Sequence, residues 1–205
     1  MMKRLFPYLS GLIPGFLLIA LIGCAGMPLT RFFVMSSIPD SENMVNREGE
    51  PCFALGVGPV KIPEYLNRPE VVTRLTANEV RVDDFAEWAE PLEANISRVL
   101  AGNLPSLLCT RAVALFPWKA QIPIDYRIDV QVIQMDGVLG ERALLDVSWS
   151  IADGADRRKP PLLTKRSSYE EPTGGESHGS FVSAQSRNLA RLSRDIAEAV
   201  LGLPR

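Results

Sequence analysis

The fold is decided by residues 124–132, which read IDYRIDVQV. Apolar side chains at Ile124, Tyr126, Ile128, Val130 and Val132 alternate with polar ones. This alternation is typical of a strand with one buried and one solvated face. Residues 136–140 read DGVLG and predict a hairpin turn, and residues 143–151 repeat the alternation in a return strand.

Further strands are expected on both sides of this hairpin. The candidates are residues 31–35, 53–60, 70–75, 80–82 and 162–169. Gly56 and Gly58 interrupt one of them, which indicates a bulge or a close approach of backbone. Residues 59–69 contain three prolines, so we expect this segment to run extended along an edge or the surface.

Two amphipathic helices complete the pattern. Apolar residues recur every three or four positions from Trp88 to Leu107, and Asp83 or Asp84 could cap that helix. A second stripe runs from Phe181 to Leu203. The sequence therefore predicts a single α+β domain, with a mixed, mostly antiparallel β-sheet and both helices packed on one face.

The amino end has the three parts of a secretory signal. Lys3 and Arg4 precede an apolar run, and small residues follow it. Residues 21–24 read LIGC and resemble the bacterial lipobox, in which the cysteine is acylated, although a signal peptide can also end near a cysteine by chance. We predict that residues 1–23 are a lipoprotein signal peptide and that residues 24–30 are an acylated tether.

Acylation of Cys24 would hold the protein on a membrane through fatty chains such as palmitate. Each buried methylene contributes about 0.8 kcal/mol, so two or three chains would make dissociation negligible. Ala25 follows the cysteine, where the usual inner-membrane retention signal has an aspartate. The lipobox resemblance thus implies the periplasmic face of the outer membrane.

Composition argues against several classes of function. The 205 residues carry a net charge of −2, which gives no electrostatic footprint for nucleic acid. A single histidine and three cysteines are too few for a His-rich metal site or a zinc ribbon. We therefore predict no cofactor, no metal and no nucleic-acid partner.

Residues 175–179 read GESHG and match the nucleophile elbow of serine hydrolases. The single histidine, His178, is next to Ser177. Neighbouring side chains on a tight elbow cannot form the Ser–His hydrogen bond while a carboxylate also orients the imidazole. A solvated loop is the favoured interpretation, and we predict no catalytic residues.

Cys52 and Cys109 are the two cysteines left after acylation of Cys24. In an oxidising periplasm such a pair can form a disulfide, and two buried free thiols are the alternative. Tyr65 and Arg68, in the segment with three prolines, are candidate partner contacts, because an extended edge can pair with a neighbouring chain. A solvated loop is the simpler alternative for this segment.

Three stretches together resemble the bacterial ABC-transport auxiliary lipoproteins of the PqiC/YmbA type. They are residues 57–69 (VGPVKIPEYLNRP), residues 88–92 (WAEPL) with the helix that follows, and the closing helix at 189–200. The resemblance implies that residues 31–205 are a periplasmic auxiliary domain. It also implies an MCE-domain protein and its permease as partners, and a homo-oligomeric ring as one form of assembly.

The sequence thus favours an outer-membrane-anchored, non-catalytic accessory subunit of an MCE-type intermembrane lipid transport system that maintains envelope integrity. A free-standing periplasmic lipid-binding or structural lipoprotein is the main alternative, and a serine hydrolase is a weaker one. The lipid cargo, the direction of transport and the partner-contacting surface stay open.

Overall fold

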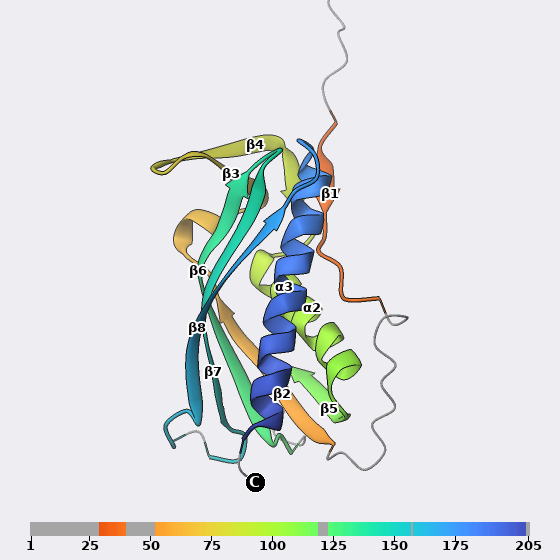
Figure 1. Cartoon of the computed structure of the whole chain (residues 1–205), viewed down its shortest axis with the longest axis vertical. Coiled ribbons are helices and arrows are strands. Elements are labelled where there is room, and N and C mark those ends of the chain that lie inside the picture. Colours follow the sequence, from red (N-terminus) through yellow and green to blue (C-terminus); the bar gives the residue numbers. More distant parts are fainter. Residues whose placement is uncertain (1–28, 40–51, 119–122, 157, 204–205) are drawn as a thin grey trace, which may run out of the picture.

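The computed structural model describes residues 29–39, 52–118, 123–156 and 158–203 (Figure 1). Eight strands, two α-helices and one 3-10 turn follow one another in this part of the chain. They are β1 (Arg31–Phe33), β2 (Phe53–Lys61), η2 (Glu64–Leu66), β3 (Glu70–Thr76), β4 (Glu79–Trp88), α2 (Leu92–Leu107), β5 (Thr110–Leu115), β6 (Tyr126–Val138), β7 (Arg142–Asp153), β8 (Leu163–Pro172) and α3 (His178–Leu201).

Five strands form the larger sheet, in the order β5-β2-β6-β7-β8. β2 runs parallel to both β5 and β6, whereas β7 is antiparallel to both of its neighbours, β6 and β8. Tyr126, Ile128 and Val130 are buried, and Arg127 and Asp129 between them are more exposed. The alternating strand predicted from residues 124–132 is confirmed as the middle of this sheet.

Both helices cover the same face of the larger sheet (Figure 1). α2 contacts β2 and β5, α3 contacts β7 and β8, and the helices contact each other. Trp149 and Ile151 of the sheet are buried in one apolar core with Leu192 and Ile196 of α3. Burial of apolar surface drives this packing, and the predicted α+β class is confirmed.

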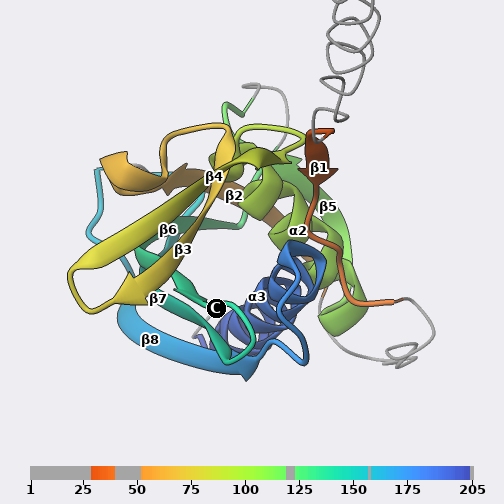
Figure 2. The same ribbon diagram turned by 90° about the horizontal axis from the view of Figure 1, so that it is seen from above.

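The remaining three strands form a second sheet, in the order β1-β4-β3. Seen from above, this small sheet crosses one end of the molecule (Figure 2). The expectation of a single sheet therefore needs correction. The expectation that residues 59–69 run extended along an edge or the surface is also wrong in part. Residues 59–61 belong to β2, a central strand whose pairing with β6 is irregular around Pro59. The chain leaves the larger sheet after Lys61, forms the η2 turn and starts the second sheet at β3.

Three local expectations also need correction. Residues 79–88 form the strand β4, so Trp88 is the last residue of a strand and does not lie in the first helix. Asp83 lies inside this strand and caps no helix. The helix α2 begins at Leu92, directly after Pro91. β5 had not been expected as a strand. The hairpin turn falls at residues 139–141, so β6 continues through Asp136 to Val138.

Buried amide side chains fix the amino-terminal segment against α2. Asn95 Oδ1 accepts a hydrogen bond from the Met35 backbone N–H at 3.2 Å, and Asn103 Oδ1 accepts one from Ile38 N–H at 2.8 Å. Both asparagines are fully buried. Because a buried polar group needs a partner, these two bonds set the path of residues 34–39 down the side of the helices.

Candidate partner-docking groove

Two separate stretches of the resemblance meet in one groove, which we call the motif groove. It is lined by residues 66–69 from the segment with three prolines and by residues 88–93, which lead into α2. The volume of the groove is about 420 Å³. Stretches some twenty residues apart in the chain are therefore parts of one surface.

Backbone hydrogen bonds bring the two sides of the motif groove together. Trp88 N–H donates to the Pro69 carbonyl at 2.7 Å, and Ala89 N–H donates to the Phe33 carbonyl at 2.8 Å. Leu66 N–H closes the η2 turn by donating to Pro63 at 3.0 Å. The groove is thus joined to β1, the strand nearest the amino-terminal tether.

The motif groove has a buried apolar floor and an exposed rim. Leu66, Trp88 and Leu92 are at most 8% exposed and belong to the hydrophobic core. Arg68 and Pro91 are exposed on the rim. A rigid apolar floor under an accessible rim is the arrangement that protein interfaces use for anchoring contacts.

Charges of opposite sign line the rim. Among the described residues Arg68 makes no ion pair, so its guanidinium is available to a partner. Glu90 accepts a hydrogen bond from Arg98 Nε at 2.8 Å, and that arginine also donates to the Met35 carbonyl at 3.0 Å. Glu93 completes the acidic side. Such a rim can orient a partner of complementary charge.

The structure places Tyr65 differently from Arg68. The Tyr65 hydroxyl donates to Asp136 Oδ2 at 2.9 Å, and Arg74 donates from Nε and Nη2 to the same carboxylate at 2.9 and 2.6 Å. Gln134 Nε2 donates a further bond at 2.7 Å. This carboxylate cluster joins η2, β3 and β6, so the phenol is engaged inside the domain while Arg68 faces outward.

The cluster shifts the pKa values of its members. Burial alone would raise the pKa of Asp136, but the hydrogen bonds from Arg74, Gln134 and Tyr65 outweigh it and hold that pKa below the usual carboxyl range. Burial, reinforced by the neighbouring Asp136 charge, raises the pKa of Tyr65 to about 12. At neutral pH the carboxylate is therefore ionised and the phenol neutral.

Asp136 was missed as a structural residue because its sequence context resembles a turn. The Asp136-Gly137 pair is a common hairpin signal, yet the side chain of Asp136 is fully buried. The β6–β7 register shifts between Val132 and Gln134. This irregularity breaks the alternation that marked the earlier part of the strand, so periodicity did not identify Asp136 as inward-facing.

Of the three cysteines, two lie in the described part of the chain. Cys52 and Cys109 are joined by a disulfide, with their Cα atoms 4.4 Å apart. Phe53 N–H also donates to the Cys109 carbonyl at 2.9 Å, beside the first residues of the parallel pair β2 and β5. Cys24, the predicted lipidation site, lies outside the described residues.

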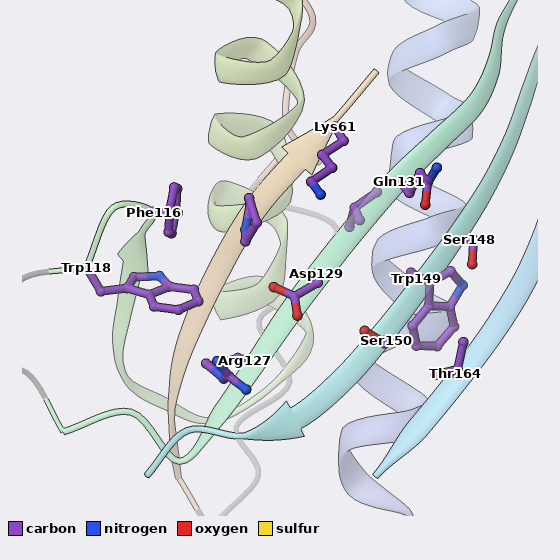
Figure 3. A pocket seen from close by; sticks show the side chains of 12 residues that line it. Lys61, Phe116, Trp118, Arg127, Asp129, Gln131, Ser148, Trp149, Ser150 and Thr164 are labelled. Atoms are coloured by element: carbon purple, nitrogen blue, oxygen red, sulfur yellow. The ribbon is translucent and has the colours of Figure 1, made fainter. Parts of the chain in front are cut away.

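A second hollow lies on the face of the larger sheet away from the helices (Figure 3). Its volume is about 390 Å³, and Arg127, Asp129 and Gln131 line it with Phe116 and Trp118. The last two rings pack edge to face, with centroids 5.4 Å apart. This polar hollow with an aromatic wall contains neither Tyr65 nor Arg68.

Glycines in β2 make room for that aromatic wall. A Cβ atom at Gly56 would lie 2.9 Å from the Trp118 ring, and one at Gly58 would lie 2.9 Å from Phe116 Cβ. Gly58 also has φ +103°, which disfavours other residues. A bulge or a close approach of backbone was predicted here. The register of β2 against β6 shifts between Val57 and Val60, and the atoms that approach the two glycines most closely are side-chain atoms.

Ser177 and His178 lie at the start of α3, where Ser177 caps the helix and His178 is its first residue. The Ser177 hydroxyl accepts a hydrogen bond from Ser180 N–H at 3.1 Å and is the N-cap of the helix. The His178 ring lies 6.0 Å from the Phe33 ring, and its Nε2 is 3.7 Å from Asp83 Oδ2. Burial lowers the pKa of His178, against the opposing effect of Asp83.

The described residues contain neither a cluster of metal ligands nor a membrane-spanning helix. Within the described residues, no three His, Cys, Asp or Glu side chains are grouped to hold a metal ion. The helices of this same part of the chain are too short or too polar to cross a bilayer.

Solved structures share the fold. A crystal structure of an uncharacterized protein is 17% identical, with a TM-score of 0.64 over 84% of this chain and 99% of the other. A Xanthomonas campestris protein of the DUF330 family is 15% identical, with a TM-score of 0.67 over 84% of this chain and 95% of the other. No curated protein matches.

The family model of the ABC-type transport auxiliary lipoprotein component matches residues 33–197. That range includes the motif groove, the carboxylate cluster and most of α3. The chain therefore belongs to the family of ABC-type transport auxiliary lipoproteins, as its sequence resemblance implied.

Proposed function

We propose that the protein is a lipoprotein held on the periplasmic face of the outer membrane by acyl chains on Cys24. Residues 1–23 would be its signal peptide, residues 24–30 its tether and residues 31–205 the working domain. That domain would be a non-catalytic accessory subunit of an MCE-type intermembrane lipid transport system. Its role is positional: it holds the periplasmic part of the transporter near the outer membrane.

The motif groove is the observation that carries this proposal. The stretches on which the resemblance rests line a surface with buried Leu66, Trp88 and Leu92 below and exposed Arg68 above. An apolar floor with charged edges suits a protein segment that inserts one apolar side chain and pairs its own charges with the rim. The MCE-domain protein or its permease would supply that segment.

The position of the motif groove suits an anchored subunit. Arg31 begins β1 seven residues after Cys24, and a chain of that length spans at most about 25 Å. β1 contacts the groove through Phe33, whose carbonyl accepts the bond from Ala89. Acylation of Cys24 would therefore keep the groove close to the membrane surface.

The disulfide between Cys52 and Cys109 supports a periplasmic location, because disulfides persist in oxidising compartments. The outer membrane as the target rests on Ala25 after the predicted acylated cysteine. The homo-oligomeric ring implied by the resemblance stays a prediction.

Affinity capture from crosslinked cells tests the proposal. The full chain with a carboxyl-terminal tag is captured after treatment with a membrane-permeable crosslinker, and the bound proteins are identified by mass spectrometry. We expect an MCE-domain protein or its permease in the captured complex. A reproducible complex without any transporter component contradicts the proposal, and the same capture without crosslinker controls for adhesion to the resin.

A further inference from the structure

Another groove, separate from the motif groove and from the hollow on the larger sheet, lies between α3 and residues 36–39. We call it the arginine groove. Its lining includes Ile38 and Pro39 of that segment, Glu171 of β8, and Arg187, Arg191 and Arg194 of α3. Its volume is about 540 Å³. Figure 1 shows the segment after β1 running beside α3, and Ser36 N–H donates to Ser186 Oγ at 3.2 Å.

The charge of this groove is unbalanced. Arg187, Arg191 and Arg194 lie on one face of α3, at spacings of four and three residues. Among the described residues that line the groove, Glu171 is the only acidic one. Three guanidinium groups thus face one carboxylate, which leaves two formal positive charges in the lining.

Two of these guanidinium groups are held in place by the protein. Arg187 donates to Glu171 Oε2 at 3.0 Å and to the Pro172 carbonyl at 2.6 Å. Arg191 donates to the Glu170 carbonyl at 3.1 Å and to Glu171 Oε1 at 3.4 Å, and it lies over the Tyr169 ring, 5.4 Å from its centroid. Guanidinium has five N–H donors, so both side chains keep donors in reserve.

The third guanidinium group is not neutralised. Arg194 is exposed and, within the described residues, forms no ion pair. The nearby Asp195 accepts the Tyr169 hydroxyl at 2.7 Å, so that carboxylate is engaged elsewhere. Ile38 and Pro39 add an apolar wall beside these cations.

We propose that the arginine groove binds a phosphate ester. Fixed guanidinium groups recognise phosphate oxygens through paired, charge-assisted hydrogen bonds. Arg191 and Arg194 would bind the phosphate, and the organic part would lie against Ile38 and Pro39. The same chemistry fits the headgroup of an anionic phospholipid and a free phosphate ester, and it requires neither a transporter nor the motif groove.

Titration of the full acylated chain in a neutral maltoside detergent tests this site. Isothermal titration calorimetry measures the binding of three probes: inorganic phosphate, glycerol 3-phosphate and soluble dihexanoyl-phosphatidylglycerol. Arg194→Glu reverses the unpaired charge, and Arg194→Gln removes it with less perturbation. Arg158→Glu is the matched control, because its side chain is 97% exposed and lies in the turn between β7 and β8.

We expect saturable binding of glycerol 3-phosphate that weakens about tenfold or more in Arg194→Glu and less in Arg194→Gln. Arg158→Glu should bind as the unmodified chain does. Tighter binding of phosphatidylglycerol identifies the lipid headgroup as the source, whereas equal binding identifies a free ester. Absence of saturable binding by all three probes, or equal affinity in Arg194→Glu and Arg158→Glu, overturns the proposal.

Discussion

The larger sheet and the small sheet are attached to the molecule in different ways. The larger sheet buries Val147, Trp149 and Ile151 of β7 in the core beneath α3, with no more than 1% of each residue exposed. The small sheet contributes Val71, Val72 and Trp88 to the same apolar core, and it is linked to β6 in addition by the buried carboxylate of Asp136, which Arg74 binds from β3. Removing one partner of this ion pair leaves an uncompensated charge, a cost that the truncation of an apolar side chain does not carry.

The surfaces of the two sheets differ as well. The solvent face of the larger sheet is mainly polar, as Arg127 and Asp129 illustrate. In the small sheet Phe32 is 65% exposed and Phe85 is 44% exposed. Phe32 pairs with Glu87, two residues from Phe85, so both aromatic side chains lie on one face of β1 and β4. The small-sheet end thus presents two exposed aromatic side chains that could contact a partner.

Replacing Asp136 should have the largest effect. Asp136→Asn removes the charge that compensates Arg74, whose side chain is 21% exposed, and should lower the free energy of unfolding by about 3 kcal/mol. Urea unfolding at pH 7 measures this change. Asp146→Asn is the control, because Asp146 pairs with a 65% exposed Arg166 and should cost less than about 1 kcal/mol. Equal costs would contradict the difference between the sheets.

The effect of Asp136→Asn should depend on pH. Because the folded-state pKa of Asp136 lies below its usual value, ionised Asp136 stabilises the fold fully above the unfolded pKa of about 3.9. This contribution is lost as the pH falls through the folded-state pKa. The difference in the free energy of unfolding between the unmodified chain and Asp136→Asn should therefore narrow below about pH 4. A difference that widens there would contradict the stabilising role of ionised Asp136.

Removal of the disulfide should have an effect of similar size, and it should act on the larger sheet. The bridge joins residues 57 positions apart, and closing a loop of that size stabilises a fold by about 2–4 kcal/mol. We expect this loss in the Cys52→Ser/Cys109→Ser double variant. Thiol titration of the unreduced, unfolded chain provides the check, since titratable thiols at both positions would show that the bridge is absent.

Tyr65→Phe should have a smaller effect, about 1 kcal/mol, because it removes one hydrogen bond to Asp136 and leaves those from Arg74 and Gln134. Thermal unfolding measures it. This variant should capture transporter components as the unmodified chain does. Loss of capture without loss of stability would instead make the Tyr65 side chain a partner contact.

Arg68→Glu should have the smallest effect on stability, within about 0.5 kcal/mol, because the side chain is exposed on the rim of the motif groove. Capture of the transporter components should nevertheless fall sharply. Arg158→Glu, remote from the groove, serves as the comparison variant in the capture assay. Unchanged capture by Arg68→Glu would show that the partner does not use this rim.

The same difference between the sheets explains what could be predicted from the sequence. Residues 124–132 and the stripe around Leu192 each follow one period, and they form the predicted strand and helix. Gly56 and Gly58 indicated a bulge or a close approach in β2, and the side chains of Trp118 and Phe116 lie against these two glycines. These signals are local, because the period of burial follows from the geometry of each element.

The small sheet was harder to predict because its determinants are not local. The ion pair between Arg74 and Asp136 joins residues 62 positions apart, and neither residue belongs to a periodic pattern. Trp88 fits the apolar stripe of a helix as well as it fits a strand. In the structure the helix begins only after Pro91, and Trp88 is the last residue of β4. The motif groove likewise forms only when two separate stretches meet. Arg68 could therefore be proposed as a contact from the sequence, but the residues that surround it in the groove could not be predicted.

Site-specific photo-crosslinking in living cells tests the docking role of the motif groove most directly. A photoreactive amino acid is placed at Arg68 on the rim and, in a separate strain, at Arg158 at the β7–β8 turn. We predict that mass spectrometry recovers an MCE-domain protein or its permease crosslinked to position 68 and not to position 158. Equal crosslinking from both positions, or position-68 products that contain no transporter component, would contradict docking through the motif groove.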